Sequence, residues 1–286
     1  MVRRLIVNAD DFGLRTSVSE GIIDAFQNGQ VSSTTLMVNV PGTEEAVGLA
    51  EQYPDLGVGL HFNLTEGRPL TSANSLTDEA GVFHSRARLL KNSFMHAIDP
   101  SEITSELTAQ LDRIEDLGIT PTHLDSHQHI HMAPSIFGAM SPVLHDRVRR
   151  LRLVLPPRKH LNHLTDFRPP ALFRNELLRW SAIRIRETFQ GLTNDRFVSL
   201  HLLPPRTTWT ADAYKSLALS NPTSSVTEVM VHPFAPGDDQ NHFFGELNQT
   251  AHKEFLTKCH SEHRILTGPP VFDPQEFQLI TFDQLD

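Results

Sequence analysis

Strand-like apolar segments alternate with segments of helical periodicity along most of this chain. This order predicts βαβ units, in which helices connect parallel strands. Strands are expected near residues 5–7, 33–40, 57–62, 122–126, 151–155, 197–203 and 228–232. Helices are expected near residues 17–28, 43–50, 101–117, 171–190 and 248–260. Roughly six to eight such units predict an α/β fold, an irregular (β/α) barrel.

The length of the chain favours a single domain over residues 1–286. The stretch near residues 65–99 is polar and irregular, and we interpret it as an insertion that lies over the functional site. The alternative architecture is a doubly wound open sheet. A dinucleotide-binding fold has no support, because no Gly-x-Gly-x-x-Gly motif follows the first expected strand.

The composition of the chain limits the cellular compartments and the kinds of partner that we expect for the protein. Cys259 is the only cysteine, which excludes a disulfide within the chain and favours a reducing compartment. No apolar run reaches the length of a signal-peptide core or a membrane span, so we expect a cytoplasmic protein. The net charge of −9 argues against a nucleic-acid partner, since phosphate binding favours a basic surface. The oligomeric state is left open, and a homodimer is compatible with the sequence.

Polar clusters follow four of the expected strands. They lie at residues 8–13 (NADDFG), 61–63 (HFN), 125–131 (DSHQHIH) and 232–233 (HP). The carboxyl ends of parallel strands meet at one face of an α/β barrel, so these clusters are expected to converge there. Imidazoles and carboxylates together are typical of metal binding and proton transfer.

Asp10 and Asp11 are adjacent carboxylates that repel each other unless a cation lies nearby. A bound metal ion explains the pair: one carboxylate ligates it, and the other stays available as a general base beside it. The simpler alternative is that these residues cap the following helix.

The third cluster places Asp125, His127, His129 and His131 at alternate positions. If the strand continued through them, all four side chains would share one face. The His-x-His spacing is familiar in metal sites. The alternative is a polar strand edge with hydrogen-bonded histidines. We expect His123, nearer the start of the strand, to be a buried and hydrogen-bonded histidine.

His61 and His232 each end an apolar strand. Taken alone, His61 could equally be a hydrogen-bonded histidine of the core or a metal ligand. The other polar clusters favour the interpretation as a metal ligand. His232, followed by Pro233, suits a proton donor to a leaving group. The alternative for His232 is a structural histidine that holds the next loop.

The clusters and their flanking residues resemble the ordered motifs of the YdjC-like carbohydrate deacetylase family. That family includes chitooligosaccharide deacetylases and enzymes of hopanoid biosynthesis. The resemblance runs from residue 5 to about residue 235, and it implies an irregular (β/α) barrel related to polysaccharide deacetylases. Residues near 156–225 match poorly, which marks a variable region for substrate choice. The matching motifs are residues 8–13, 59–67 (GLHFNLTEG), 122–131 (THLDSHQHIH) and 228–233 (EVMVHP).

The resemblance implies a metal-dependent hydrolase that removes the acetyl group from an N-acetylated amino sugar. The substrate would be a chitooligosaccharide or a lipid-linked sugar. Asp11, His61 and His127 would bind one divalent metal ion. Asp10 would act as the base and His232 as the acid.

Arg152 resembles a family arginine that orients the base carboxylate. The family is commonly described with Mg²⁺, whereas imidazole ligands favour Zn²⁺ or another transition metal. Family members often carry Pro-Gly after the last histidine. This chain has Pro233-Phe234 instead, which changes the expected pocket wall.

Two other functions stay open as alternatives. A metallophosphoesterase also needs Asp and His clusters, but it usually binds two metal ions about 3.5–4 Å apart. A non-catalytic sugar-binding or metal-binding protein would not need Asp10 or His232. Counting bound metal ions separates the first alternative from a deacetylase, and mutation of those two residues separates the second.

Overall fold

The computed structural model describes residues 2–155, 169–203, 208–220, 222–237, 239 and 249–286. Its centre is a sheet whose paired strands are parallel, with the order β6-β5-β4-β3-β2-β1-β8-β7 and with β9 also paired to β1. The strands are β1 (Arg3–Phe12), β2 (Ser33–Leu36), β3 (Gly57–Phe62), β4 (Leu124–Ser126), β5 (Arg150–Leu151), β6 (Leu192–Thr193), β7 (Arg196–Val198), β8 (Thr227–Val231) and β9 (Phe277–Leu279).

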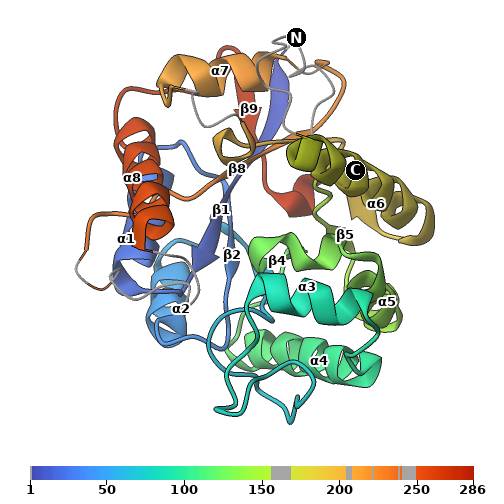
Figure 1. Cartoon of the computed structure of the whole chain (residues 1–286). Coiled ribbons are helices and arrows are strands. Elements are labelled where there is room, and N and C mark those ends of the chain that lie inside the picture. The colour runs from blue at the N-terminus through green and yellow to red at the C-terminus, as the bar shows by residue number, and fades with distance from the viewer. Residues whose placement is uncertain (1, 156–168, 204–207, 221, 238, 240–248) are drawn as a thin grey trace.

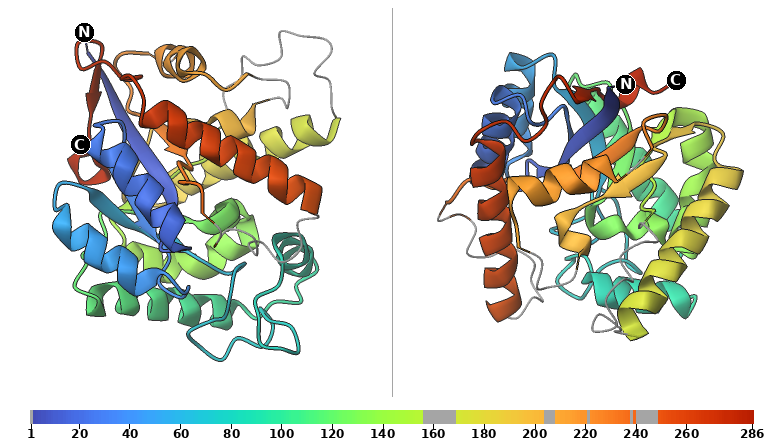
Figure 2. Two further views of the ribbon diagram at one scale, coloured as in Figure 1. Left: turned by 90° about the vertical axis from the view of Figure 1, so that its left-hand side faces the viewer. Right: turned by 90° about the horizontal axis from the view of Figure 1, so that it is seen from above.

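Helices lie around the outside of the curled sheet, as Figure 1 and the view from above in Figure 2 show. The α-helices are α1 (Thr16–Gln27), α2 (Thr43–Gln52), α3 (Arg86–Phe94), α4 (Pro100–Asp116), α5 (Pro134–Arg147), α6 (Pro169–Thr188), α7 (Ala211–Leu219) and α8 (Gln249–Leu266). The 3₁₀ helices include η1 (His127–Met132), η4 (Leu200–Leu202) and η6 (Phe282–Gln284).

The strand order identifies the architecture. From β2 to β6, each strand lies next to the strand that precedes it in the sequence, and the sheet grows in one direction only. In a doubly wound sheet, the direction of growth reverses at a switch point. No pairing between β6 and β7 is found among the described strands, so the barrel is incomplete. The expected irregular (β/α) barrel is confirmed.

The sheet is buried on both faces, which explains why its strands are apolar over most of their length. Leu5, Ile6 and Val7 of β1 are fully buried. On α1, the apolar face expected from the sequence is buried through Val18 and Ile22. Burial on both faces is typical of parallel sheets covered by helices. Among the described residues, no helix is both long and apolar enough to cross a bilayer.

β1 is longer than the sequence pattern predicts. The expected strand ended at Val7, but pairing with β2 continues to Phe12 across an irregularity between Ala9 and Phe12. Asp11 lies in this irregularity with a left-handed φ of 72°. The first polar cluster therefore lies within β1 and does not follow it, because the neighbouring strands continue to pair there and the irregularity accommodates the extra residue.

β4 is shorter than the cluster at residues 125–131 would allow. It ends at Ser126, and η1 follows with left-handed φ values of 54° at Gln128 and 58° at His129. The chain therefore leaves the strand alternation at His127. The four alternating side chains do not share one face, because that arrangement required the strand to continue.

The stretch near residues 65–99 contains α3 and is fastened to α4 by two carboxylates, the buried Glu106 and the half-buried Glu102. Glu106 accepts hydrogen bonds from the backbone N–H groups of Leu70 and Thr71, both at 3.0 Å. Glu102 accepts one from the N–H of Ser75 at 2.8 Å. Part of the expected variable region near 156–225 lies outside the described residues, namely residues 156–168, 204–207 and 221. Residue 248, the first of the last expected helix, also lies outside them.

Candidate active site

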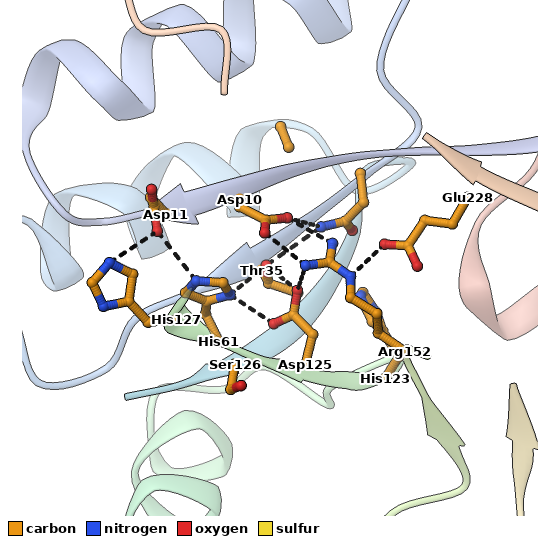
Figure 3. A network of polar contacts seen from close by, with 12 residues as sticks. Asp10, Asp11, Thr35, His61, His123, Asp125, Ser126, His127, Arg152 and Glu228 are labelled. Atoms are coloured by element: carbon orange, nitrogen blue, oxygen red, sulfur yellow. Dashed lines mark hydrogen bonds and ion pairs between the residues drawn. The ribbon is translucent and has the colours of Figure 1, made fainter. Parts of the chain in front are cut away.

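Asp11, His61 and His127 converge although they come from three separate segments, β1, β3 and η1 (Figure 3). The Oδ1 atom of Asp11 lies 3.1 Å from Nε2 of His61 and 3.9 Å from Nε2 of His127. All three side chains are buried. Asp11 Oδ1 accepts no well-aligned hydrogen bond among the described residues. A buried carboxylate oxygen facing two imidazole nitrogens fits a divalent metal ion.

Hydrogen bonds on the far side of each ring fix the two imidazoles. Nδ1 of His61 lies 2.6 Å from Oδ1 of Asp125 and 3.0 Å from the hydroxyl of Thr35. Nδ1 of His127 lies 2.8 Å from the hydroxyl of Thr65. These contacts leave Nε2 of both rings directed at Asp11, which is how a metal-binding histidine is usually oriented.

Arg152 is a fully buried cation beside this group. Its Nη1 and Nη2 atoms donate to the two oxygens of Asp10, each at 2.6 Å. Nη1 also lies 2.5 Å from Oδ2 of Asp125, and Nε lies 2.6 Å from Oε1 of Glu228. The planar guanidinium thus fixes the orientation of Asp10 through a bidentate pair (Figure 3).

The buried network perturbs the pKa values of its carboxyl groups in opposite directions. Burial opposes ionisation of Asp10, but the guanidinium of Arg152 holds the Asp10 pKa well below its ordinary value. Burial raises the pKa of Glu228 to about 8, and the nearby Asp10 and Asp125 charges add to that effect. Asp10 is therefore ionised at neutral pH, whereas much of Glu228 carries its proton.

The two expected imidazole ligands also differ in pKa. Burial alone would lower the pKa of His61, but the Asp125 and Asp11 carboxylates raise it to about 10. Burial lowers the pKa of His127 to about 4, so this ring is neutral at neutral pH. A metal ion at His61 would displace a proton from that ring, because ligands bind in their deprotonated form.

His232 directly follows β8 and faces Asp11 from another side. Its Nε2 atom lies 3.8 Å from Oδ2 of Asp11, and its backbone N–H donates to Glu262 at 2.6 Å. Burial and the neighbouring His201 lower the pKa of His232. The structure thus places the expected metal ligands Asp11, His61 and His127 close to Asp10, Arg152 and His232. Their chemical roles stay predictions.

Among the described residues, two groups of side chains offer ligand-type atoms within 4.8 Å of one another: Asp10, His61 and Asp125, and His201, His232 and Glu262. In the first group, the guanidinium of Arg152 already pairs with both carboxylates, so a second cation would meet its positive charge. The charge of Arg152 thus argues against a metal ion in the first group, and an ion between His61 Nε2 and Asp11 stays a prediction.

The remaining histidines of the third motif have structural contacts. His131 bonds to the hydroxyl of Ser126 at 2.5 Å and to the backbone oxygen of Arg152 at 3.1 Å. The ring of His129 meets Phe197 edge-on, with centroids 5.7 Å apart. None of these contacts involves Asp11, His61 or His127.

His123 is buried and stacks on Phe282 with ring centroids 3.7 Å apart. Its Nδ1 atom bonds to the hydroxyl of Thr122 at 2.9 Å, while Nε2 has no hydrogen-bond partner among the described residues. The expected buried histidine is present, but only one of its ring nitrogens is hydrogen-bonded.

Helix capping does not explain the two aspartates. α1 begins at Thr16, and the residue before it, Arg15, makes no side-chain capping bond. Asp10 is held by Arg152 instead, and Asp11 faces the two imidazoles.

The sequence reasoning missed several residues that contact the site. Thr35 is a buried polar side chain outside the matching motifs, and Thr65 lies within the motif at residues 59–67 but was not singled out. Glu262 lies on α8, beyond the matching motifs. The side chains of Asp125 and Glu228 lie within those motifs, but their pairing with Arg152 was not predicted.

The protein is a (β/α)-barrel protein with carboxylates and imidazoles at the carboxyl ends of its strands. In barrels of this class, that end of the sheet is where active sites lie. The particular family follows from sequence comparison. The family model described as YdjC-like protein matches residues 4–273, and the chain belongs to this family.

Similar proteins agree with this assignment. A carbohydrate deacetylase of Geobacillus stearothermophilus is 42% identical over 204 residues, which cover 70% of this chain and 74% of that protein. A chitooligosaccharide deacetylase of Yersinia pestis (strain Pestoides F) is 46% identical over 154 residues, 54% of this chain and 60% of that protein. A crystal structure of a proposed cellobiose-phosphate cleavage protein from Enterococcus faecalis superposes with a TM-score of 0.72 at 20% identity, covering 99% of this chain and 98% of that one. That structural similarity concerns the fold alone.

Proposed function

We propose that this protein is a metal-dependent carbohydrate deacetylase that hydrolyses the acetamide of an N-acetylated amino sugar. The observation that carries the proposal is the convergence of Asp11 with His61 and His127 beside an ionised Asp10. Relatives described as carbohydrate and chitooligosaccharide deacetylases support the substrate class. A chitooligosaccharide or a lipid-linked amino sugar fits this class.

Asp11, His61 and His127 are the residues proposed to hold one divalent metal ion. Such an ion supplies Lewis-acid polarisation and lowers the pKa of water when it is bound. The imidazoles favour Zn²⁺ or another transition metal by ligand type, whereas the family resemblance favours Mg²⁺. The unsatisfied Oδ1 of Asp11 agrees with either ion.

The other residues of the site are proposed to move protons. Asp10, held in one orientation by Arg152, takes the proton of the attacking water. His232 delivers a proton to the departing amine. Because burial lowers the pKa of His232, the ring must gain a proton during the reaction before it donates one. His232 takes this proton from solvent, and Asp10 returns the proton of the attacking water to solvent as the products leave, so the proton count of the hydrolysis is balanced.

The test of this function is acetate release from N-acetylglucosamine oligomers, with and without added Mg²⁺ or Zn²⁺. We expect the metal-loaded protein to release acetate. Asp11→Ala and His127→Ala should lower the rate by orders of magnitude, because each removes one of the proposed ligands. Wild-type rates in both variants would reject the assignment of the site.

A metallophosphoesterase is the second candidate, and one observation favours it. The group formed by His201, His232 and Glu262 has the ligand types of a second metal site. A phosphoesterase would release phosphate from sugar phosphates and would usually hold two ions about 3.5–4 Å apart. Phosphate release without acetate release would favour this candidate over the deacetylase.

A further inference from the structure

Glu262 is a fully buried carboxylate on α8 that joins several elements behind His232. Its Oε2 atom accepts the backbone N–H of His232 at 2.6 Å and lies 3.0 Å from Nε2 of His201. The hydroxyl of Tyr214 donates to its Oε1 atom. An ionised carboxylate only accepts hydrogen bonds, so Nε2 of His201 carries the proton in this contact.

Glu262 is ionised in these surroundings. Burial would raise its pKa, but His201, His232 and the Tyr214 hydroxyl hold the pKa below its ordinary value. Both carboxylate oxygens therefore accept hydrogen bonds, and together they link α8 to η4, α7 and the end of β8.

Aromatic rings also pack against His232. The His201 ring packs against it with centroids 4.6 Å apart and planes at 73°, and the Phe255 ring lies 5.6 Å away. Glu262 holds the backbone of His232 and not its ring. The His232 Nδ1 atom is 3.9 Å from Glu262 Oε2 and has no hydrogen-bond partner among the described residues.

The group also has the ligand types of a cation site, but its hydrogen bonds argue against one. An ion bound by Glu262 and His201 would have to displace the proton that joins them. It would also compete with the backbone N–H of His232 for the same carboxylate oxygen. A carboxylate whose oxygens already accept buried donors is better suited to fixing its neighbours in place.

We infer that Glu262, together with His201, is a positioning pair that fixes the turn carrying His232 so that its ring faces Asp11. The inference rests on the proposed function, in which His232 protonates the leaving amine. The distance of 3.8 Å between His232 Nε2 and Asp11 Oδ2 is the geometry that this pair maintains.

The test compares Glu262→Ala and Glu262→Gln with wild type in acetate release from N-acetylglucosamine oligomers. We expect kcat to fall about 10²-fold in the alanine variant with little change in KM, because a displaced catalytic group affects turnover more than binding. Glu262→Gln keeps an accepting oxygen near His232, so we expect a smaller fall of about 10-fold. Glu254→Gln, an exposed position on the same helix, is the matched control and should behave as wild type.

Amide hydrogen exchange at His232 gives a readout that does not need turnover. We expect faster exchange of this amide in both Glu262 variants, because the N–H loses or weakens its buried acceptor. If wild type releases no acetate, the proposed function fails, while the exchange data still test the positioning pair.

Three results would overturn the inference. One is an unchanged kcat in a folded Glu262→Ala protein. Another is an unchanged rate of hydrogen exchange at the His232 amide in Glu262→Gln. This measurement tests the inference even if the alanine variant does not fold. The third is loss of a bound metal ion from either variant, which would show that His201, His232 and Glu262 form a cation site.

Discussion

Arg152 is the residue on which the charge balance of the buried centre depends. It pairs with Asp10 and Asp125 and contacts Glu228, and no part of it is exposed. Taking charges out of water is unfavourable, so each partner depends on the others being present. Arg152 therefore orients the proposed base and also makes its burial tolerable.

We expect Arg152→Gln to lower the free energy of unfolding by about 3–5 kcal/mol, because the substitution leaves buried carboxylates without their cation. Urea denaturation measures the change. Arg152→Lys restores the charge without the planar fork and should lose less stability. A loss below about 1 kcal/mol in the glutamine variant, the level of a surface ion pair, would contradict this account of the network.

The buried His123 is expected to lower the free energy of unfolding of the protein in acid. Burial lowers its pKa from 6.5 to about 3 in the folded protein. The unfolded chain therefore binds the proton more readily, and stability is lost as pH falls from 6.5 toward 3. His123→Phe keeps the stacking on Phe282 but cannot be protonated.

Between pH 7 and pH 5, we expect the free energy of unfolding to fall by about 2 kcal/mol more in wild type than in His123→Phe. Urea unfolding at the two pH values measures both losses. Equal losses in the two proteins would show that His123 does not contribute to acid sensitivity.

The site was predictable from the sequence only where polar residues end apolar strands. Asp11, His61 and His232 stand out in this way, and the structure brings them together. Thr35 and Glu262 could not be found by the same signal, because a buried threonine in a strand and a glutamate on a helix are ordinary residues at such places. Their contacts depend on which elements become neighbours in three dimensions.

Among the elements, α1 and the loop after β8 are in closer contact than sequence patterns reveal. A Cβ atom added to Gly21 of α1 would lie 2.1 Å from the backbone oxygen of Pro233 and 2.3 Å from the backbone nitrogen of Ala235. This glycine is a position of close approach, and the loop it contacts begins directly after His232.

We expect Gly21→Ala to destabilise the protein by about 1–3 kcal/mol, because backbone atoms of the loop must move. It should also lower acetate release, since the displaced loop follows His232. Gly48→Ala in α2 is the matched control: apart from its chain neighbours and the backbone of its own helix, no atom of the described residues lies within 4 Å of an added Cβ there. That variant should gain up to about 1 kcal/mol from helix propensity. Thermal unfolding of both proteins tests the contrast, and equal stability of the two variants would contradict the close approach.

Several elements were predictable from the sequence, whereas α3, α5 and α7 were not expected. β3 matches its expected range because an apolar run coincides with a fully paired strand. β1 continues past the apolar run, since pairing with β2 and β8 extends to polar residues. β4 ends at Ser126 as expected, but it does not continue through the histidine cluster, because η1 turns the chain through left-handed backbone at Gln128 and His129, and no residue pattern predicted this turn.

At the scale of the whole molecule, the curled sheet gathers residues that are far apart in the sequence. Asp11 on β1, His61 on β3 and His127 on η1 meet at the carboxyl ends of the strands, and α8 supplies Glu262 behind His232. The order of strands in a barrel made this convergence predictable in outline. The side-chain distances were not, because they depend on the irregularity in β1 and the turn at η1.

The most direct test of the central claim is the metal content of the purified protein, measured by elemental analysis after loading and gel filtration. We predict one divalent ion per chain in wild type. Asp11→Asn keeps the shape of the side chain and tolerates left-handed backbone, but it lacks the anionic oxygen, so we predict that its bound metal is lost. Full metal content in folded Asp11→Asn would contradict the assignment of Asp11, and two ions per wild-type chain would contradict the single-ion centre.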